Sequence, residues 1–235
     1  PDETYVWAFA VCEIGNEDNI VIGNNIDDFM MLLEIRTNAT YYFHNLKFDG
    51  EFIIYWLLKH GFTHIENRKN KKDKTFSTLI SDMGMFYTIE IYFKVTNKHV
   101  KKVKLVDSLK IIPFSVNDIG KSFGLPISKL EIDYDEPREK GHILTPEERE
   151  YITNDVKIVA MALNVLFSER LTRITSASNS LYNFKGTHSK SKFENMFPKL
   201  TYEADKDMRK AYKGGFTYLN PIYKEKDTGS GVVLD

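Results

Sequence analysis

The chain has 235 residues, 42% of them hydrophobic and 28% charged, which is enough apolar material for one large domain or one and a half ordinary ones. A formal net charge of -1 excludes a uniformly basic surface, so any site for a polyanion must be a local cluster of Lys and Arg. The single cysteine, Cys12, excludes an internal disulfide and favours a reducing compartment, and no apolar run approaches the roughly 20 residues of a membrane span.

Strand-like and helix-like patterns alternate along the first two thirds of the chain. In chain order they predict a buried strand at 5–14 with Cys12 in the core, a helix at 25–35, a strand at 41–44, a helix at 48–58, three hairpin-linked strands at 78–83, 85–95 and 100–106, and helices at 114–123 and 147–170. The last helix has a clear start, with Thr145 as N-cap, Pro146 in the first position and Glu148 closing a capping box. The alternation predicts a mixed α/β layer fold.

The composition changes after Thr172, where Ser, Asn, Lys and Thr become frequent and only short helical segments follow, at 192–197 and 203–212. We therefore expect an α/β domain at 1–172, a helical connector at 173–217, and the start of a further domain at 218–235. The first residue is Pro1, no leader opens the chain, and the last residues stop inside a strand-like run, so we expect both ends to be cuts.

The turn after the strand at 41–44 carries a first candidate site. Asn45 and Asp49 stand at the entrance of the next helix, and α/β enzymes place metal ligands at the carboxyl ends of buried strands. The alternative is that both residues only cap and charge the first helical turn. Spacing alone leaves the two interpretations open.

The long helix at 147–170 carries a second candidate site. Tyr151 and Asp155 are four residues apart and so share a face, which borders an apolar stripe that draws Asp155 towards the interior. A carboxylate there needs a cation or a hydrogen-bond donor, and a divalent metal is one such partner. The alternative is an ordinary boundary Asp in solvent.

Five motifs in order resemble those of protein-primed family B DNA polymerases of small phages and linear plasmids. Residues 42–50 resemble the second exonuclease motif, and Asp107-Ser-Leu-Lys110 resembles the segment that grips single-stranded DNA. Lys129 stands where the family carries a catalytic lysine, and Tyr151-Ile-Thr-Asn-Asp155 resembles the third exonuclease motif. Tyr212-Lys-Gly-Gly-Phe216 matches the Tyr-x-Gly-Gly motif between the exonuclease and polymerase domains. The resemblance extends from about residue 5 to residue 235.

The resemblance implies an RNase H-like 3′→5′ exonuclease domain followed by the beginning of a family B polymerase palm domain. Asp49 and Asp155 would be ligands of two Mg²⁺ or Mn²⁺ ions, with Tyr151 orienting the attacking water. Lys129 would lie near the scissile phosphate. Asp235 would bind a metal of the nucleotide site in the palm.

The resemblance also implies eight residues that contact DNA: Asn45, Phe48, Ser108, Leu109, Tyr212, Gly214, Gly215 and Phe216. Each has a plainer interpretation. Phe48 and Leu109 could be core residues, Ser108 a local turn hydroxyl, and the glycine pair a simple turn. His44 is best explained as a structural neighbour of Asn45, and the lysines from 98 to 104 as a solvated hairpin face.

The family's first exonuclease motif, Asp-x-Glu on a strand upstream of Tyr5, is missing from the sequence, and the adjacent pair Asp2-Glu3 does not replace it. Two alternatives therefore stay open, a stand-alone DEDDy-type 3′→5′ exonuclease and a catalytically inactive module that binds single-stranded DNA or a primer protein. The expected partners are single-stranded and primer–template DNA, dNTPs in the full-length protein and a terminal primer protein. We expect a monomer without membrane contact, in the cytoplasm of a bacterial host or, for a linear plasmid, in mitochondria.

Overall fold

The chain is described by a computed structural model for residues 4–211, 221–226 and 229, and it divides into two compact units, Pro1–Asn183 and Phe184–Asp235. The strands are β1 (Phe9–Glu13), β2 (Asn16–Gly23), β3 (Thr40–Phe43), β4 (Thr63–His64), β5 (Thr75–Ile80), β6 (Phe86–Val95) and β7 (Val100–Asp107). The α-helices are α1 (Ile26–Ile35), α2 (Leu46–Lys59), α3 (Val116–Ser122), α4 (Pro146–Ser168), α5 (Ser176–Gly186), α6 (Lys190–Met196) and α7 (Tyr202–Ala211), and short 3-10 turns are η1 (Arg68–Asn70), η2 (Ser108–Lys110) and η3 (Pro221–Tyr223).

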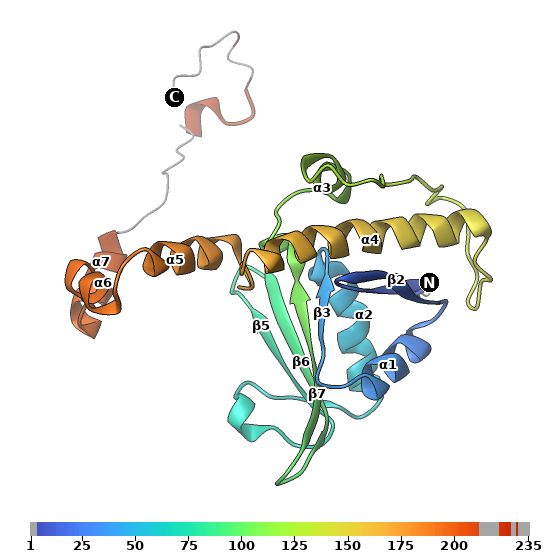
Figure 1. Cartoon of the computed structure of the whole chain (residues 1–235), viewed down its shortest axis with the longest axis horizontal. Helices are drawn as coiled ribbons and strands as arrows, with labels where there is room; N and C mark the ends of the chain where they lie inside the picture. Colours follow the sequence, from blue (N-terminus) through green and yellow to red (C-terminus); the bar gives the residue numbers. More distant parts are fainter. Residues whose placement is uncertain (1–3, 212–220, 227–228, 230–235) are drawn as a thin grey trace. The chain divides into compact units, whose positions relative to one another are not determined.

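A five-stranded sheet with the order β3-β7-β6-β5-β4 forms the centre of the first unit (Figure 1). β3 runs parallel to β7, and β6 pairs antiparallel with both of its neighbours, β5 and β7. A separate antiparallel hairpin, β1-β2, lies beside α4, which contacts both of its strands. β3 is therefore an edge strand, and its unpaired edge faces the side on which the hairpin lies.

Alternate residues of the central strands supply two apolar cores on opposite faces of the sheet, as the two-residue period of a strand requires. On one face, Ile89 and Leu105 pack in a cluster with Phe29, Leu33 and Leu57 of α1 and α2. On the other face, Val106 of β7 packs in a cluster with residues of α3 and α4, namely Ile119, Ile158, Ala162 and Leu163. The result is the predicted mixed α/β layer arrangement, with helices on both faces.

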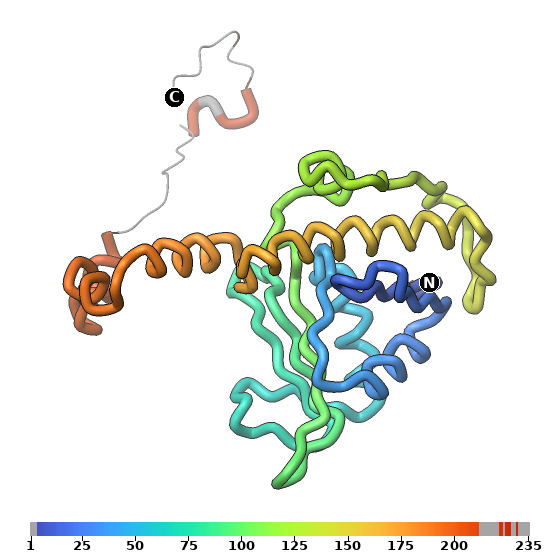
Figure 2. Tube along the Cα trace, in the orientation of Figure 1, coloured from blue at the N-terminus to red at the C-terminus, as the bar shows by residue number. Residues whose placement is uncertain are grey.

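The start of α4 follows the prediction at each position. Thr145 accepts a hydrogen bond from the Glu148 N–H at 3.2 Å, the Glu148 carboxylate accepts one from the Thr145 N–H at 3.0 Å, and Pro146 occupies the first helical position. A capping box of this kind satisfies two backbone donors that the helix leaves free. Figure 2 shows α4 and the segment before it running alongside one another for most of the helix.

Several elements differ from the sequence prediction: β4 was not predicted, and β5 lies three residues before the strand expected at 78–83. The first strand is shorter than 5–14 and only half-buried, so Cys12 is not a core residue, although burial still raises the pKa of its thiol to about 11. β2 was not predicted, because its first half, Asn16-Glu-Asp-Asn19, is polar and lacks alternation. α5 was not predicted because its Ser and Asn residues give little apolar periodicity; its N-terminal signal is Thr175, which accepts from the Ser178 N–H at 3.1 Å.

In the second unit, an aromatic cluster joins α6 to the end of α5. The rings of Phe184, Phe193 and Phe197 lie 5.1–6.1 Å apart, mostly edge to face. None of the helices in the described ranges combines the length and the apolar character needed to cross a bilayer.

Candidate active site

Two parallel strands bring the first group of predicted residues to one edge of the sheet. Phe43, the last residue of β3, is in register with Asp107, the last residue of β7, so the segments that follow them are neighbours. Asn45 has a φ of +82°, a left-handed conformation that Asn tolerates better than most residues, and its N–H donates to Asp107 Oδ1 at 3.1 Å. The Asn45 side chain is exposed and makes no cap bond to α2, so the capping interpretation does not hold for it.

Asp49 lies in the first turn of α2 and lines a cavity of the first unit. Burial raises its pKa, its own backbone N–H lowers it, and the charge of Asp107 raises it again, to about 6 in all. No Lys, Arg or His among the described residues lies within ion-pair distance of it; the cations near this edge pair elsewhere, as Lys110 does with Asp107 at 3.6 Å. A partly buried carboxylate without a counter-charge is a favourable place for a cation.

The second group of predicted residues meets at one point on α4. Lys129 Nζ lies 2.8 Å from Asp155 Oδ2, 3.1 Å from Asp155 Oδ1 and 3.1 Å from the Tyr151 hydroxyl. It also lies 4.7 Å from the centre of the Tyr151 ring, in a cation–π contact. Three residues predicted as catalytic thus form one hydrogen-bonded cluster, and Asp155 is paired rather than free in solvent.

Tyr134 completes this cluster and was not predicted as a site residue. Its hydroxyl hydrogen-bonds the hydroxyl of Tyr151, although most of its ring is exposed. Burial, this hydrogen bond and the nearby charge of Asp155 all raise the pKa of Tyr151, so its hydroxyl stays protonated at neutral pH. Asp107 was also not singled out; its buried carboxylate organises the turn by accepting the N–H groups of Asn45 and Leu109.

A cavity of about 740 Å³ connects the two groups. Its walls come from β1, β3 and α4, together with parts of α1 and α2, and both Asp49 and Asp155 line it. β1 pairs only with β2, and β3 only with β7, so each presents a free strand edge within the described part of the chain. The cavity wall therefore has the two predicted carboxylates and Glu13 of β1, together with two strand edges that can still accept a partner.

Asp49 and Asp155 offer the type of ligand that hard divalent cations bind, but two carboxylates are too few to hold such ions. Carboxylate oxygens are the ligands that Mg²⁺ and Mn²⁺ prefer, and Asp49 lacks a counter-charge. Within the described ranges, however, no group of three or more His, Cys, Asp and Glu side chains is placed to hold a metal ion. Asp49 and Asp155 would have to be joined by further ligands to form a two-ion site.

The predicted DNA-contact residues near the cavity are placed unequally. Phe48 is 66% exposed at the start of α2, next to Phe52 at a ring distance of 5.8 Å, so it is not a core residue. Leu109 is half-buried in η2. Ser108 is fully buried, and its hydroxyl donates to the Phe43 carbonyl at 2.9 Å and lies 3.1 Å from His44 Nδ1. Its hydroxyl thus joins the ends of β3 and β7 and is not open to a ligand in this conformation.

Five predicted residues lie outside the described residues, and their roles stay predictions: Tyr212, Gly214, Gly215, Phe216 and Asp235.

Comparison with known proteins gives consistent matches over the whole chain. The sequence matches the family described as DNA polymerase type B, organellar and viral, over residues 33–144 and 132–235. The DNA polymerase of Bacillus phage Nf is 48% identical over 235 residues, which are 100% of this chain and 40% of that protein. The present chain therefore spans about two fifths of the length of this relative.

Two solved structures are similar in fold as well as in sequence. Phi29 DNA polymerase complexed with single-stranded DNA has a TM-score of 0.83 and 41% identity, over 94% of this chain and 38% of that one. The ternary complex of phi29 DNA polymerase with primer-template DNA and incoming nucleotide substrates has a TM-score of 0.85 and 41% identity, over 95% of this chain and 39% of that one.

Proposed function

The chain belongs to the organellar and viral type B DNA polymerases, and we propose that it carries the 3′→5′ proofreading exonuclease domain of a protein-primed member, on an RNase H-like fold. The observation that carries this proposal is the cluster of Lys129, Tyr151 and Asp155 beside a cavity that Asp49 also lines. Residues from α2, the segment before α4, and α4 itself would act on one phosphodiester bond.

In the proposed reaction, a water oxygen attacks the last phosphorus of the strand, the bond from phosphorus to the 3′ oxygen breaks, and that oxygen takes up a proton. The products are a nucleoside 5′-monophosphate and a shortened strand with a free 3′ hydroxyl. Asp49 and Asp155 would hold Mg²⁺ or Mn²⁺, which supply the charge that activates water and stabilises the leaving oxygen. The protonated Tyr151 hydroxyl would orient the water, and Lys129 would offset charge on the phosphate.

The family's Asp-x-Glu strand would supply the two carboxylates that this site lacks. We propose that such a strand occupies the cavity between β1 and β3, because each has a free edge and both predicted ligands line the space. A strand there would join the hairpin to the five-stranded sheet. It would also bring its own side chains to the wall that carries Asp49 and Asp155.

DNA is the proposed partner, in single-stranded form at the exonuclease site and as primer–template in the full-length protein. The two similar phi29 polymerase structures are complexes with one of these forms each. The Tyr-x-Gly-Gly segment at 212–216 would contact the DNA between the two activities, and Asp235 would bind a metal in the palm. dNTPs and a terminal primer protein complete the set of proposed partners.

In the full-length protein, Asp235→Ala should stop nucleotide incorporation but leave 3′-end degradation; loss of both in a folded variant would show that its role is assigned wrongly.

The experiment that tests the proposal follows digestion of a 5′-labelled single-stranded oligonucleotide by the full-length protein with Mg²⁺. We expect stepwise shortening from the 3′ end, lost in Asp49→Asn, which keeps the shape of the side chain but removes its charge. Glu51→Gln, an exposed site two residues along α2, is the control and should digest normally. Binding without digestion by the unsubstituted protein would favour an inactive DNA-binding module, and digestion without any template-directed synthesis would favour a stand-alone exonuclease.

A further inference from the structure

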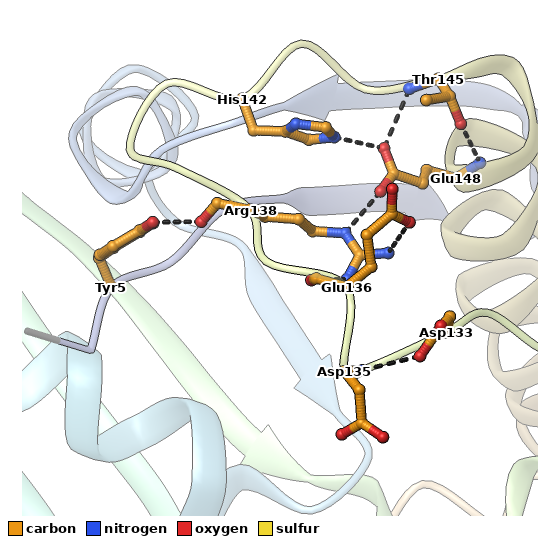
Figure 3. Close-up of polar contacts among 8 residues, drawn as sticks. All are labelled: Tyr5, Asp133, Asp135, Glu136, Arg138, His142, Thr145 and Glu148. Atoms are coloured by element: carbon orange, nitrogen blue, oxygen red, sulfur yellow. Dashed lines mark hydrogen bonds and ion pairs between the residues drawn. The ribbon is translucent and has the colours of Figure 1, made fainter. Parts of the chain in front are cut away.

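Glu148 accepts more hydrogen bonds than a helix cap requires (Figure 3). One carboxylate oxygen accepts from the Thr145 N–H at 3.0 Å and lies 2.6 Å from His142 Nε2, while the other accepts from Arg138 Nε at 2.5 Å. The side chains of Glu148 and Arg138 are both only 6% exposed. The capping box needs Thr145 alone. The contacts of Glu148 to Arg138 and His142 instead attach the segment that carries those two residues to α4.

That segment, residues 125–145, contains no helix or strand and is here called the strap. It runs antiparallel to α4 along one face of the helix, which Figure 2 shows as two adjacent lengths of tube. Three side-chain pairs tie it to successive turns of α4: Lys129–Asp155, Tyr134–Tyr151 and Arg138–Glu148. A segment of this length without regular structure depends on such contacts for its conformation.

The far end of the strap is also held by residues that lie just before β1 and just after β2. The Tyr5 hydroxyl donates to the Arg138 carbonyl, and the guanidinium of Arg138 lies 4.5 Å from the centre of the Trp7 ring. Asn24 Nδ2 donates to the His142 carbonyl at 3.0 Å. Arg138 therefore contacts both the Trp7 ring and the Glu148 carboxylate, and these contacts hold it beside the start of α4.

We propose that Arg138 and Glu148 are positioning residues for the exonuclease reaction: their buried pair fixes the strap along α4 and so sets where the Lys129 amine and the Tyr134 hydroxyl meet the reacting groups. The proposal rests on the exonuclease function proposed above. Neither residue lines the cavity or contacts Asp49 or Asp155, so they act through the strap. Breaking the pair removes the tie two turns from Asp155 and leaves the strap near Lys129 held by the Tyr134–Tyr151 contact and by Asn154 Nδ2, which donates to the Ser128 carbonyl at 3.2 Å.

The contribution of the Arg138–Glu148 ion pair to stability does not by itself account for a buried pair at this place. A buried pair often stabilises a fold no better than apolar side chains of similar size, because removing both charges from water offsets their attraction. What the pair adds is a defined alignment, because Arg presents its N–H groups in a fixed planar arrangement. One misplaced catalytic group can lower a rate by about 100-fold for a shift of about 1 Å.

The test compares Arg138→Met and Glu148→Gln in the full-length protein with matched controls at exposed neighbours on the same turn of α4, Arg149→Met and Glu147→Gln. Amide hydrogen exchange of residues 129–142, measured without metal or DNA, should become faster in both pair variants and stay unchanged in both controls. With single-stranded DNA and Mg²⁺, kcat should fall roughly 10- to 100-fold in the pair variants, while KM changes little. Arg138→Lys, which keeps the charge but not the planar geometry, should recover part of the rate.

A second comparison separates positioning from a general loss of structure. In a Lys129→Met, Tyr134→Phe background, adding Arg138→Met should lower kcat by no more than about twofold, because Arg138 is proposed to act through those two groups. A full additional loss there, unchanged exchange of the strap, or normal kcat in the pair variants would each overturn the inference. If Arg138→Met fails to fold, Arg138→Lys decides the question by the same two measurements. Absence of digestion by the unsubstituted protein would instead refute the proposed function, and the exchange measurement would still report on the strap.

Discussion

The ε-amino group of Lys129 lies 2.8 Å from Oδ2 of Asp155, although 26 positions separate the two residues in the chain. The strap makes this contact possible by bringing Lys129 back along α4. Asp155 and Lys129 are 22% and 29% exposed, so the pair is partly open to a ligand rather than sealed in the core. In the reaction proposed above, Asp155 would bind a metal ion and the Lys129 amine would lie near the phosphate, and this partial exposure leaves both groups accessible.

Removing this amine should reduce catalysis more than binding. For Lys129→Met in the full-length protein, we expect kcat for 3′-end digestion to fall by about 100-fold, as on loss of one group that stabilises a charged transition state. KM should change little. Lys140→Met, an exposed lysine of the same strap, is the control. Equal losses in both variants would mean that the strap needs its total charge rather than this amine.

Phe48 should contribute to holding the frayed strand, because its exposed ring at the start of α2 can stack on a base. Phe48→Ala should weaken binding of single-stranded DNA by roughly 1–3 kcal/mol. Its melting temperature should hardly change, because the ring is already 66% exposed. Tyr55→Ala, a ring of 61% exposure two turns along the same helix, is the matched control. Fluorescence anisotropy with a labelled oligonucleotide would measure both, and equal weakening would locate the binding surface elsewhere.

Glu148 should make the stability of the first unit depend on pH in the acid range. Burial alone would raise its pKa, but hydrogen bonds from the Thr145 N–H, Arg138 and His142 outweigh burial and lower the pKa from 4.5 to about 2. Between these values the unfolded chain binds the proton and the folded chain does not, so stability rises with pH. The contribution is fully present above pH 4.5 and is lost as the pH falls towards about 2.

The size of this effect is on the order of 3 kcal/mol, from the free energy of one pKa unit. Denaturant unfolding of the unsubstituted protein and of Glu148→Gln should differ most near neutral pH and converge at about pH 2. Glu147→Gln should follow the unsubstituted protein throughout. A difference between the Glu148 variant and the unsubstituted protein that does not change with pH would show that Glu148 contributes by shape and not by charge.

Local signals predicted most of the fold. α4 begins where Thr145, Pro146 and Glu148 place it, and the alternating apolar residues of β6 and β7 identify the central hairpin. Some elements were not predicted because their local pattern is weak, as in the polar half of β2 and in the Ser-rich α5. Tertiary contacts determine the secondary structure of such segments, and these contacts leave no periodic pattern in the sequence.

The candidate site residues of α4 and Lys129 of the strap were predicted, but the other strap residues were not. Spacing places Tyr151 and Asp155 on one face of a helix, and the family resemblance supplied their roles and that of Lys129. Tyr134 and Arg138 give no comparable signal, because their partners are 17 and 10 residues away across a segment without regular structure. The contacts of Ser108 could not be predicted from the sequence either, since only the fold places its hydroxyl between Phe43 and His44; its DNA contact stays a prediction.

The two residues predicted from α4 should respond differently to substitution, and the difference tests their roles. In the full-length protein, Asp155→Ala removes a proposed metal ligand and leaves Lys129 without its partner, so digestion should be lost. Tyr151→Phe removes only a hydroxyl, keeps the ring against Lys129 and retains all carboxylate charge, so digestion should be reduced but measurable. Thr153→Ala, half-buried between them on the same helix, is the control for local changes in α4. Single-turnover digestion with saturating protein separates chemistry from binding in each variant.

If Tyr151→Phe is as inactive as Asp155→Ala while its DNA binding and melting temperature are unchanged, the hydroxyl does more than orient water. Its hydrogen bonds to Tyr134 and Lys129 would then be the part of the cluster on which the proposed reaction depends.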